Sequence, residues 1–194
     1  DAFTRYAQRP LAMSMEKTLT YAEVKAYSDQ VGAWLQQRGL QKGDRIAVMM
    51  PNCLQYGVVV AAILRAGFCV VNVNPLYTTD ELEHQLKDSG AKAIFILENF
   101  AVTLEHALPH LPEMKHIIVS KMGDFLGFKG RIVDFVLKYV KKMIPAWRID
   151  NAIAFKQVLS ESQNLNLTPV SLTHDDLAFL QYTGGTTGVA KGAM

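Results

Sequence analysis

Short apolar runs recur along the chain, and polar or turn-forming residues bound each of them. Five runs are rich in β-branched or aromatic side chains and predict buried strands, at residues 45–50, 68–74, 92–97, 116–120 and 176–183. The second run stops at Pro75, which cannot donate to a strand ladder. The fifth leads directly into a stretch of Gly and Thr.

Between these runs, apolar residues repeat at helical spacing. Thr20 and Glu23 form a capping-box pattern, and Gly39 stands where a left-handed residue commonly follows a helix. The apolar stripe between them consists of Val24, Tyr27, Val31, Trp34 and Leu35. A second, more apolar helix is predicted at 54–66.

Two further helices complete the alternation. Thr79 is the expected cap of a helix with acidic residues in its first turn and Gly90 after its last turn. A short helix is expected at 100–108. Strands that alternate with helices at this pitch predict an α/β fold, with a mostly parallel sheet and helices on both faces. Ligands of such sheets bind beyond the carboxyl ends of the strands.

One uncharged stretch, between Arg45 and Arg65, is about long enough to cross a bilayer. Pro51, Asn52 and Gln55 interrupt it near the middle. A buried strand, a turn and a buried helix therefore explain it better than a membrane span.

The segment 121–148 has a different character. Within it, residues 131–144 predict an amphipathic helix whose apolar side chains fall in one arc of roughly 200°. The segment holds seven basic and two acidic residues, a local net charge of +5. Two interpretations stay open: a helix packed on the domain with a solvated basic face, or a helix that meets anionic lipid, with Phe125 and Phe128 as added anchors.

Composition narrows the protein class. The chain has 194 residues, 49% apolar and 20% charged, which is typical of a globular soluble protein. The formal net charge of +2 gives no general attraction to nucleic acid. Cys53 and Cys69 lie in apolar runs and are expected to be buried free thiols. Asp1 is not followed by a leader pattern, so we expect an internal piece or a trimmed chain.

No acid–base or metal constellation emerges from the remaining polar residues. His106 and His110 have the spacing of a helical metal pair, but Pro109 between them breaks the helical register. Asp175 and Asp176 fit a turn before the last strand. We therefore expect neither a metal site nor catalytic side chains within this chain.

The Gly-Thr stretch has the composition of a phosphate-binding loop. Gly184, Gly185 and Gly188 allow the backbone to point its N–H groups inward. Neighbouring Thr hydroxyls add donors, and Lys191 adds a cation. The alternative is a flexible hairpin or linker. The stretch does not fit the pattern G-x-x-x-x-G-K-[ST] of the Walker loop.

The stretch "LQYTGGTTGVAKGA" resembles the phosphate-loop motif of the adenylate-forming superfamily, which includes acyl-CoA synthetases, luciferases and peptide-synthetase adenylation domains. Ala190 stands where many members have Pro. The stretches "GDRIAVMMPNCLQY" and "RAGFCVVNVNPLYTTDELEHQLKDSGAKAIF" extend the resemblance to bacterial long-chain fatty-acid–CoA ligases over nearly the whole chain.

The resemblance implies a two-step reaction with ATP, Mg²⁺ and coenzyme A. A long-chain fatty acid and ATP would give acyl-adenylate and pyrophosphate, and coenzyme A would then displace AMP. It also implies a cytoplasmic enzyme, and it leaves open whether the enzyme is peripheral on the inner face of the cell membrane, with 121–148 in contact with anionic lipid. The residues it implies for the ATP phosphates are Tyr182, Thr183, Gly184, Gly185, Thr186, Thr187, Gly188, Val189, Ala190, Lys191, Gly192 and Ala193.

The resemblance further implies that residues 1–194 are an N-terminal portion of the large AMP-binding domain, with 121–148 as a basic amphipathic insertion. An acidic metal ligand, a ribose-binding aspartate, a hinge and a lysine on a mobile C-terminal domain would all lie downstream. We therefore expect this chain alone to be inactive, with a frayed segment from Gly184 to Met194. Two alternatives remain: an adenylate-forming enzyme for another carboxylic acid, and a non-catalytic module that binds membranes or partners. A monomer and an oligomer are equally open.

Overall fold

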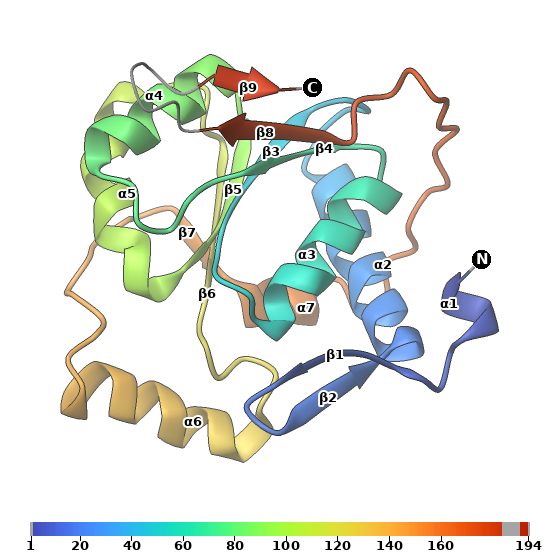
Figure 1. Cartoon of the computed structure of the whole chain (residues 1–194), viewed down its shortest axis with the longest axis horizontal. Helices are drawn as coiled ribbons and strands as arrows, with labels where there is room; N and C mark the ends of the chain where they lie inside the picture. Colours follow the sequence, from blue (N-terminus) through green and yellow to red (C-terminus); the bar gives the residue numbers. More distant parts are fainter. Residues whose placement is uncertain (1, 184–190, 194) are drawn as a thin grey trace.

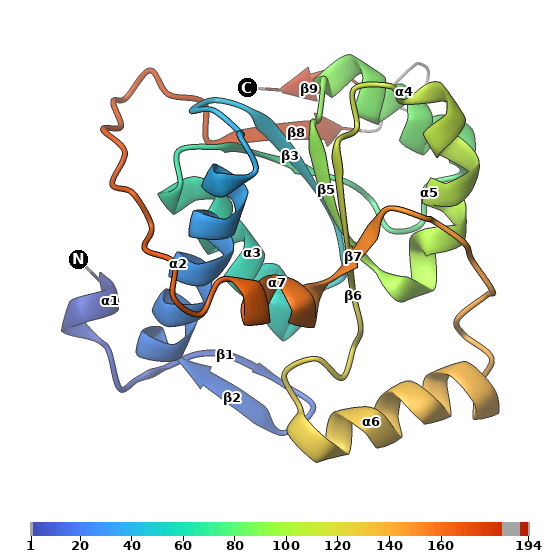
Figure 2. The same ribbon diagram turned by 180° about the vertical axis from the view of Figure 1, so that it is seen from behind.

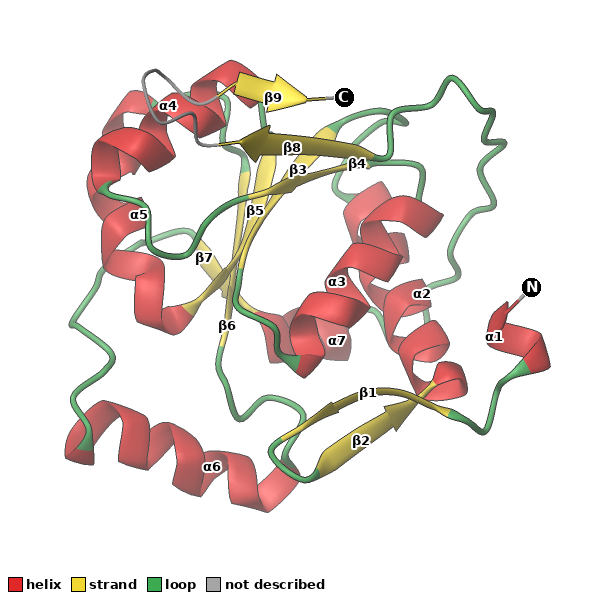
Figure 3. Ribbon diagram, viewed as in Figure 1, coloured by secondary structure: helices red, strands yellow, loops and turns green. Residues whose placement is uncertain are grey.

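The computed structural model describes residues 2–183 and 191–193, and it shows the predicted α/β architecture (Figures 1 and 3). The main sheet has seven strands in the order β7-β6-β5-β3-β4-β8-β9. All neighbouring pairs from β7 to β8 are parallel, and β9 pairs antiparallel with β8. The strands are β3 (Arg45–Met49), β4 (Cys69–Asn72), β5 (Ala93–Leu97), β6 (His116–Ser120), β7 (Ala152–Ala154), β8 (Phe179–Thr183) and β9 (Lys191–Ala193).

Helices cover both faces of the sheet (Figures 1 and 2). One face packs against α2 (Tyr21–Gln37), α3 (Leu54–Arg65) and α7 (Phe155–Glu161). The other packs against α4 (Thr79–Ser89) and α5 (Ala101–Ala107), with the short 3-10 turns Glu98–Phe100 and Leu108–His110 on either side of α5. The prediction of helices on both faces is confirmed.

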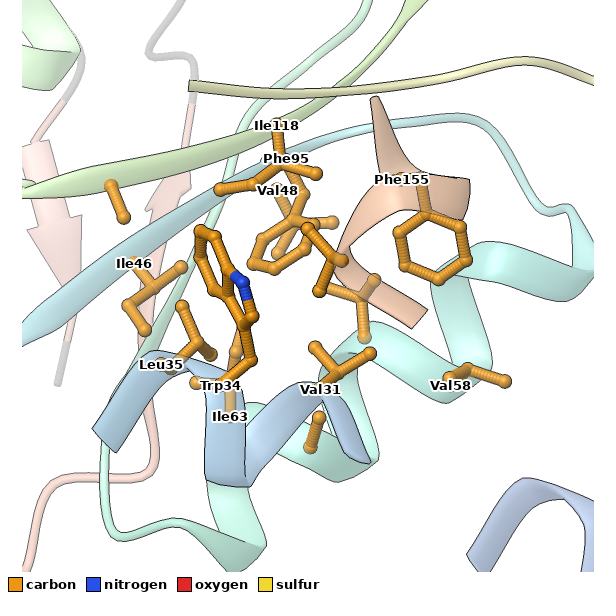
Figure 4. Packing of buried hydrophobic residues seen from close by; sticks show 14 of the residues in the cluster. Val31, Trp34, Leu35, Ile46, Val48, Val58, Ile63, Phe95, Ile118 and Phe155 are labelled. Atoms are coloured by element: carbon orange, nitrogen blue, oxygen red, sulfur yellow. The ribbon is translucent and has the colours of Figure 1, made fainter. Parts of the chain in front are cut away.

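Alternating strand residues divide the core into two layers. Figure 4 shows the first, in which Trp34 of α2 lies among Ile46, Val48, Phe95 and further aliphatic side chains of the sheet and of α3. The residues between them, such as Ala47 and Ile94, face the second layer beneath α4 and α5. Burial on both faces explains why the strand sequences read as continuous apolar runs.

The predicted strands are found, with one displaced start. The strand expected at 176–183 begins at Phe179. The residues before it form a turn, because Asp176 accepts a hydrogen bond from the backbone N–H of Thr173 at 2.6 Å. Lys42 also forms an ion pair with Asp176 at 2.7 Å, which holds this turn against the loop before β3.

The expected cap of α4 is wrong by one residue. Thr78, not Thr79, has the extended backbone of the cap, and its Oγ1 accepts from the N–H of Glu81 at 3.3 Å. The Glu81 carboxylate accepts in return from the N–H of Thr78 at 2.8 Å. Thr79 is the first residue of the helix. The capping box at Thr20 and Glu23, in contrast, is confirmed.

An extended connection joins α7 to β8 across α2 and α3. We call residues 163–173 the strap. The Gln36 amide on α2 bonds to both the N–H and the C=O of Thr168, at 2.9 and 3.0 Å. A side chain at Gly32 would press on Leu167, and one at Gly67 would press on Val170. The strap thus carries the chain from one edge of the sheet to β4.

The hairpin β1 (Pro10–Ser14) and β2 (Lys17–Thr20) and the short helix α1 (Ala2–Arg5) lie outside the main sheet. The helix expected at 131–144 instead spans α6 (Gly127–Phe135) and one π-helical turn, η3 (Val136–Val140). Among the described residues, no helix is both long enough and apolar enough to cross a membrane.

Candidate functional site at the carboxyl edge of the sheet

A pocket of about 270 Å³ opens at the carboxyl ends of β3, β4 and β8. This is the edge where parallel sheets bind their ligands. Strand β8 also leads from here into the predicted phosphate loop. Side chains that line the pocket include Met50, Tyr56, Asn72, Asn74, Gln181 and Tyr182.

Asn72, at the end of β4, connects three sides of this pocket. Its Nδ2 donates to Oε1 of Gln181 on β8 at 2.9 Å, and its Oδ1 accepts from the Tyr56 hydroxyl of α3 at 3.0 Å. Its backbone oxygen accepts from Nε2 of Gln85 on α4 at 2.7 Å. Side chains from α3, α4 and β8 therefore bond to this one residue, which fixes the shape of the pocket.

Tyr182 fixes β8 from the other face of the sheet. Its ring is buried, and its hydroxyl donates to Oδ2 of Asp88 on α4 at 2.5 Å. Burial, together with the neighbouring Asp88 carboxylate, holds the pKa of Tyr182 far above the ordinary value of a phenol. The hydroxyl is therefore a hydrogen-bond donor and not a base. It ties the last turns of α4 to the strand that precedes the loop.

The predicted phosphate-loop residues fall into two groups. Gly184, Gly185, Thr186, Thr187, Gly188, Val189 and Ala190 lie outside the described residues. The flanking residues Tyr182, Thr183, Lys191, Gly192 and Ala193 lie in β8 and β9.

We expected the segment after the loop to be frayed, but residues 191–193 form a paired strand. Thr183 pairs with Lys191, Tyr182 with Gly192 and Gln181 with Ala193, in an antiparallel ladder. A Cβ at Gly192 would come within 3.1 Å of Cζ of Tyr182, so Gly makes room for the ring. The expectation of a frayed segment is therefore wrong for residues 191–193, because strand pairing supplies the backbone partners that we had assumed to be missing.

The chemistry available in this pocket is that of binding. Its described lining is uncharged, and it consists of amide, phenol and apolar groups. Throughout residues 2–183 and 191–193 no three His, Cys, Asp or Glu side chains converge to hold a metal ion. Burial raises the thiol pKa of both Cys53 and Cys69, so neither forms the thiolate of a nucleophile readily. Both cysteines are free, with Cys69 buried as predicted and Cys53 half-buried.

His106 and His110 do not lie on one continuous α-helix, as the intervening Pro109 indicated. Helix α5 ends at Ala107, and His110 follows in a 3-10 turn. Nδ1 of His110 lies 2.7 Å from the Glu83 carboxylate on α4, which makes this contact a link between two helices.

Sequence reasoning missed the polar floor of the pocket. The sequence analysis assigned no role to three polar residues that lie within or after predicted strands, namely Asn72, Asn74 and Gln181. A signal was present, because polar side chains that end an otherwise apolar buried strand are expected to face a site or a partner. Their convergence depends on β8 pairing with β4, which no local pattern reveals.

Comparison with known proteins agrees with this arrangement. The family model for AMP-binding enzymes matches residues 1–194. The chain is 51% identical over its whole length to the long-chain-fatty-acid–CoA ligase of Salmonella typhimurium, and 49% identical to that of Haemophilus influenzae. It spans only about a third of these relatives, 35% and 34% of their lengths.

The fold is also found in a solved structure. An anthranilate CoA ligase in complex with anthranoyl-AMP superposes with a TM-score of 0.79, at 19% identity. The match covers 98% of this chain and 32% of that one. At this identity the likeness establishes the fold, which is that of one part of a larger enzyme.

Proposed function

This chain belongs to the AMP-binding enzyme family, and from that premise we propose that the full-length protein is an AMP-forming long-chain fatty-acid–CoA ligase. The observation that carries the proposal is the identity of about half of all residues, over the whole chain, to relatives of that name. The strand order supports it, since β8, which precedes the Gly-Thr loop in the sequence, pairs with β4 and ends at the carboxyl edge of the sheet.

The proposed reaction has two steps. In the first, a fatty-acid carboxylate oxygen attacks the α-phosphorus of ATP, the bond to the β-phosphate oxygen breaks, and pyrophosphate leaves. In the second, the thiolate of coenzyme A attacks the acyl carbon, and AMP leaves with the electron pair of the acyl–oxygen bond. Both steps release an anion, so they need fixed donors and positive charge more than a base.

We assign residues 182–193 of this chain to the first step. Backbone N–H groups and Thr hydroxyls of the loop would bind the β- and γ-phosphates, and Lys191 would offset the charge of the departing pyrophosphate. The strand pair β8–β9 supports this assignment, because it fixes both ends of the loop at the edge of the pocket. Neutral groups such as Asn72 and Tyr182 shape and hold that edge.

Mg²⁺ belongs to the proposal only as the counter-ion that ATP carries. The described residues do not provide a set of ligands for it. We therefore assign no step of the reaction to a metal held by this chain.

The proposal includes the boundaries and the surroundings of the chain. Residues 1–194 would form the N-terminal portion of the large AMP-binding domain, and 121–148 an insertion within it. We place the enzyme in the cytoplasm, peripheral on the inner face of the membrane, with long-chain fatty acid, ATP and coenzyme A as partners. Its oligomeric state is not part of the proposal.

A second candidate function is adenylation of a different carboxylic acid. It draws on the anthranilate CoA ligase, whose fold this chain shares. The pocket at the carboxyl edge does not distinguish between the two candidate functions, because it is small and its described lining mixes amides with apolar groups.

The test uses the full-length protein with carboxylic acids of several chain lengths. Lys191→Ala removes the proposed cation, and Gly185→Val places a branched side chain where the backbone would approach phosphate. We expect each to lower the rate of pyrophosphate release about 100-fold or more, the usual effect of removing one stabilising donor.

Matched controls separate chemistry from folding. Lys115→Ala removes an exposed lysine far from the loop in sequence, and Gly57→Val adds a side chain whose Cβ has no atom within 4 Å other than those of its chain neighbours and the local backbone of α3. Both controls should keep the parent rate. Parent-like pyrophosphate release by both loop variants would refute the phosphate-loop assignment, and a preference for aromatic acids would favour the second candidate.

A further inference from the structure

We propose that the β1–β2 hairpin and the helix α6 with η3 together form one surface that binds an anionic lipid bilayer. Figures 1 and 2 show both elements at the same end of the molecule, away from β8, β9 and α4. The proposal extends the proposed function by naming a surface and its partner. It is measured independently of ligase activity.

The apolar side of α6 and η3 is exposed in this structure. Phe128 is 75% exposed, Phe135 58% and Tyr139 62%. Gly130 is the only buried residue of α6, and η3 has none. The interpretation of a helix whose apolar face packs on the domain is therefore wrong for the described residues.

The segment is nevertheless held firmly at both ends. Gly123 and Gly130 approach so closely that a Cβ on either would overlap the backbone of the other. Asp134 accepts from the N–H of Gly123 at 2.9 Å. At the far end, Asn99 donates to the backbone oxygen of Met143 at 3.1 Å, and Ile144 is buried. The fold thus fixes the helix in place and leaves its apolar side outward.

The hairpin continues the same surface. Met13 is 77% exposed and Met15 52%, although both belong to a short hairpin that packing could have covered. A groove of about 330 Å³ lies between the hairpin turn and α6, lined by Met15 and Lys17 on one side and by Leu126 and Val133 on the other. Lys129 of α6 reaches Glu16 of the turn at 3.7 Å.

The two elements hold most of the exposed large apolar side chains. Of the twelve such side chains among the described residues, eight lie in the hairpin or in α6 with η3, and Met143 follows three residues after η3; the eight are Leu11, Met13, Met15, Phe128, Ile132, Phe135, Tyr139 and Val140. Clustering on this scale is unusual for a surface that meets only water.

Charge identifies the partner as anionic. Lys129, Arg131, Lys138, Lys141 and Lys142 are all exposed. The two acids of the segment point inward: Asp134 binds Gly123, and Asp124 accepts from Ser120 and from the N–H of Lys121, at 2.9 and 2.8 Å. Glu16 of the hairpin turn is exposed, and its charge is offset by Lys129 at 3.7 Å. Apolar side chains bordered by exposed basic residues, with both acids of 121–148 hydrogen-bonded to neighbouring groups, suit the interface of an anionic bilayer.

The structure favours a bilayer over a covering protein segment. A protein partner would have to bring acidic residues to meet this charge, whereas a lipid surface supplies both apolar depth and negative charge. An extended basic surface matches an extended anionic layer.

The experiment measures binding of the full-length protein to vesicles by co-sedimentation. Neutral phosphatidylcholine vesicles are compared with vesicles that contain 30% phosphatidylglycerol (roughly the anionic content that gives a strong surface potential). We expect binding to the anionic vesicles only, and weaker binding as salt rises, because surface charges are screened beyond about 8 Å at physiological ionic strength.

Three variants test the contributions of different parts of the surface to vesicle binding. Lys138, Lys141 and Lys142 changed together to Glu should weaken binding about 100-fold or more, since each basic residue contributes roughly 1 kcal/mol near an anionic surface. Phe128→Ser with Phe135→Ser should weaken it at least tenfold through lost apolar insertion. Met13→Ser with Met15→Ser should weaken it by a smaller factor, which tests the contribution of the hairpin.

Matched controls lie elsewhere on the surface. Leu76 is 83% exposed and Leu172 52%, and neither belongs to these elements, so Leu76→Ser with Leu172→Ser should leave binding unchanged. Lys115→Glu serves in the same way for a single charge. All variants are also assayed for pyrophosphate release with a fatty acid kept below its micelle concentration, which reports on the proposed function separately.

Other outcomes would overturn the proposal. Vesicle binding that ignores all three variants and salt would exclude this surface. A fall in melting temperature for the Phe variant, with vesicle binding unchanged, would show that another part of the full-length protein covers the helix. A change from oligomer to monomer in the same variant, again with unchanged vesicle binding, would assign the surface to a second copy of the chain.

Discussion

At the scale of single residues, the start of α4 depends on which of two adjacent threonines is the cap. Both Thr78 and Thr79 precede an acidic first turn, and a sequence pattern alone admits either. The structure selects Thr78 because its backbone is extended and because Glu81 lies three residues beyond it, within reach of the reciprocal bond.

This choice gives a paired prediction. Thr78→Ala should lower the free energy of unfolding of this chain by about 1 kcal/mol, the usual loss for a cap. Thr79→Ala, one residue on, should change it by only a few tenths, because the Thr79 side chain has no capping role. Urea unfolding of the two variants side by side measures the difference. Equal losses would mean that the helix begins one residue later than described.

The pKa of Glu81 gives the same cap a pH dependence. The Thr78 backbone N–H and hydroxyl hold the pKa of this carboxyl below its ordinary value. The stabilisation is therefore complete above the unfolded pKa, about 4.3, and is lost as the pH falls through the folded value. The cap thus operates fully at neutral pH.

At the scale of elements, α6 depends on two glycines rather than on its apolar stripe. The contact between Gly123 and Gly130 brings two backbones together at the base of the helix. Close approach of this kind needs residues without a side chain on both partners.

We therefore expect opposite effects from two identical substitutions. Gly130→Ala should disturb the seat of α6 and increase amide hydrogen exchange across residues 127–140, with a cost of roughly 1–3 kcal/mol for the overpacked contact. Gly57→Ala, inside α3 and open to added atoms, should stabilise the chain by about 0.5–1 kcal/mol. Hydrogen exchange and thermal unfolding together report both. Unchanged exchange in 127–140 of the Gly130 variant would show that the glycine contact does not hold the helix.

The strand boundaries show which parts of the fold could be predicted from the sequence. The strands at 45–50, 92–97 and 116–120 were predicted to within about one residue, because buried parallel strands carry an apolar run that is hard to mistake. The start of β8 was missed by three residues: the turn expected at Asp175 and Asp176 was found, but its bond from Thr173 to Asp176 and its ion pair with the distant Lys42 keep residues 176–178 out of the strand. Long-range contacts of this kind leave no local pattern.

One part of the candidate site could be predicted from the sequence, and another part could not. The Gly-Thr loop could be recognised from the sequence, because the residues that form its motif are contiguous. The pocket beside it could not, because Asn72 and Gln181 meet only after β8 has paired with β4. The helix α6 was foreseen, but whether its apolar face is exposed was left open, since amphipathic spacing is the same whether that face meets protein or lipid.

At the scale of the whole molecule, the two proposed binding surfaces lie at opposite ends of the described structure. The strands that flank the loop lie at one end, and the basic apolar surface lies at the other (Figures 1 and 2). On a membrane, the proposed ATP end would therefore face water, where ATP and coenzyme A are dissolved. The fatty acid would approach from the opposite side.

The final prediction concerns this 194-residue chain in isolation. We expect no acyl-CoA product and an ATP dissociation constant of about 1 mM or weaker, because the pocket is small and its described lining is uncharged. Chemistry also requires positioning, and a misplacement of about 1 Å can cost roughly 100-fold in rate. Isothermal titration and a thioester assay, with the full-length protein as positive control, provide the test. Micromolar affinity or any turnover by the isolated chain would contradict it.

The pairing of β8 with β9 also has a consequence for chain entropy. Thr183 and Lys191 are partners across the ladder, so the two ends of the intervening stretch, residues 184–190, are held together. The entropy of closure is lost when the protein folds, not when ATP binds. Doubling the loop would add only about 0.6 kcal/mol to closure. The length of the stretch between β8 and β9 therefore has little effect on the stability of the fold.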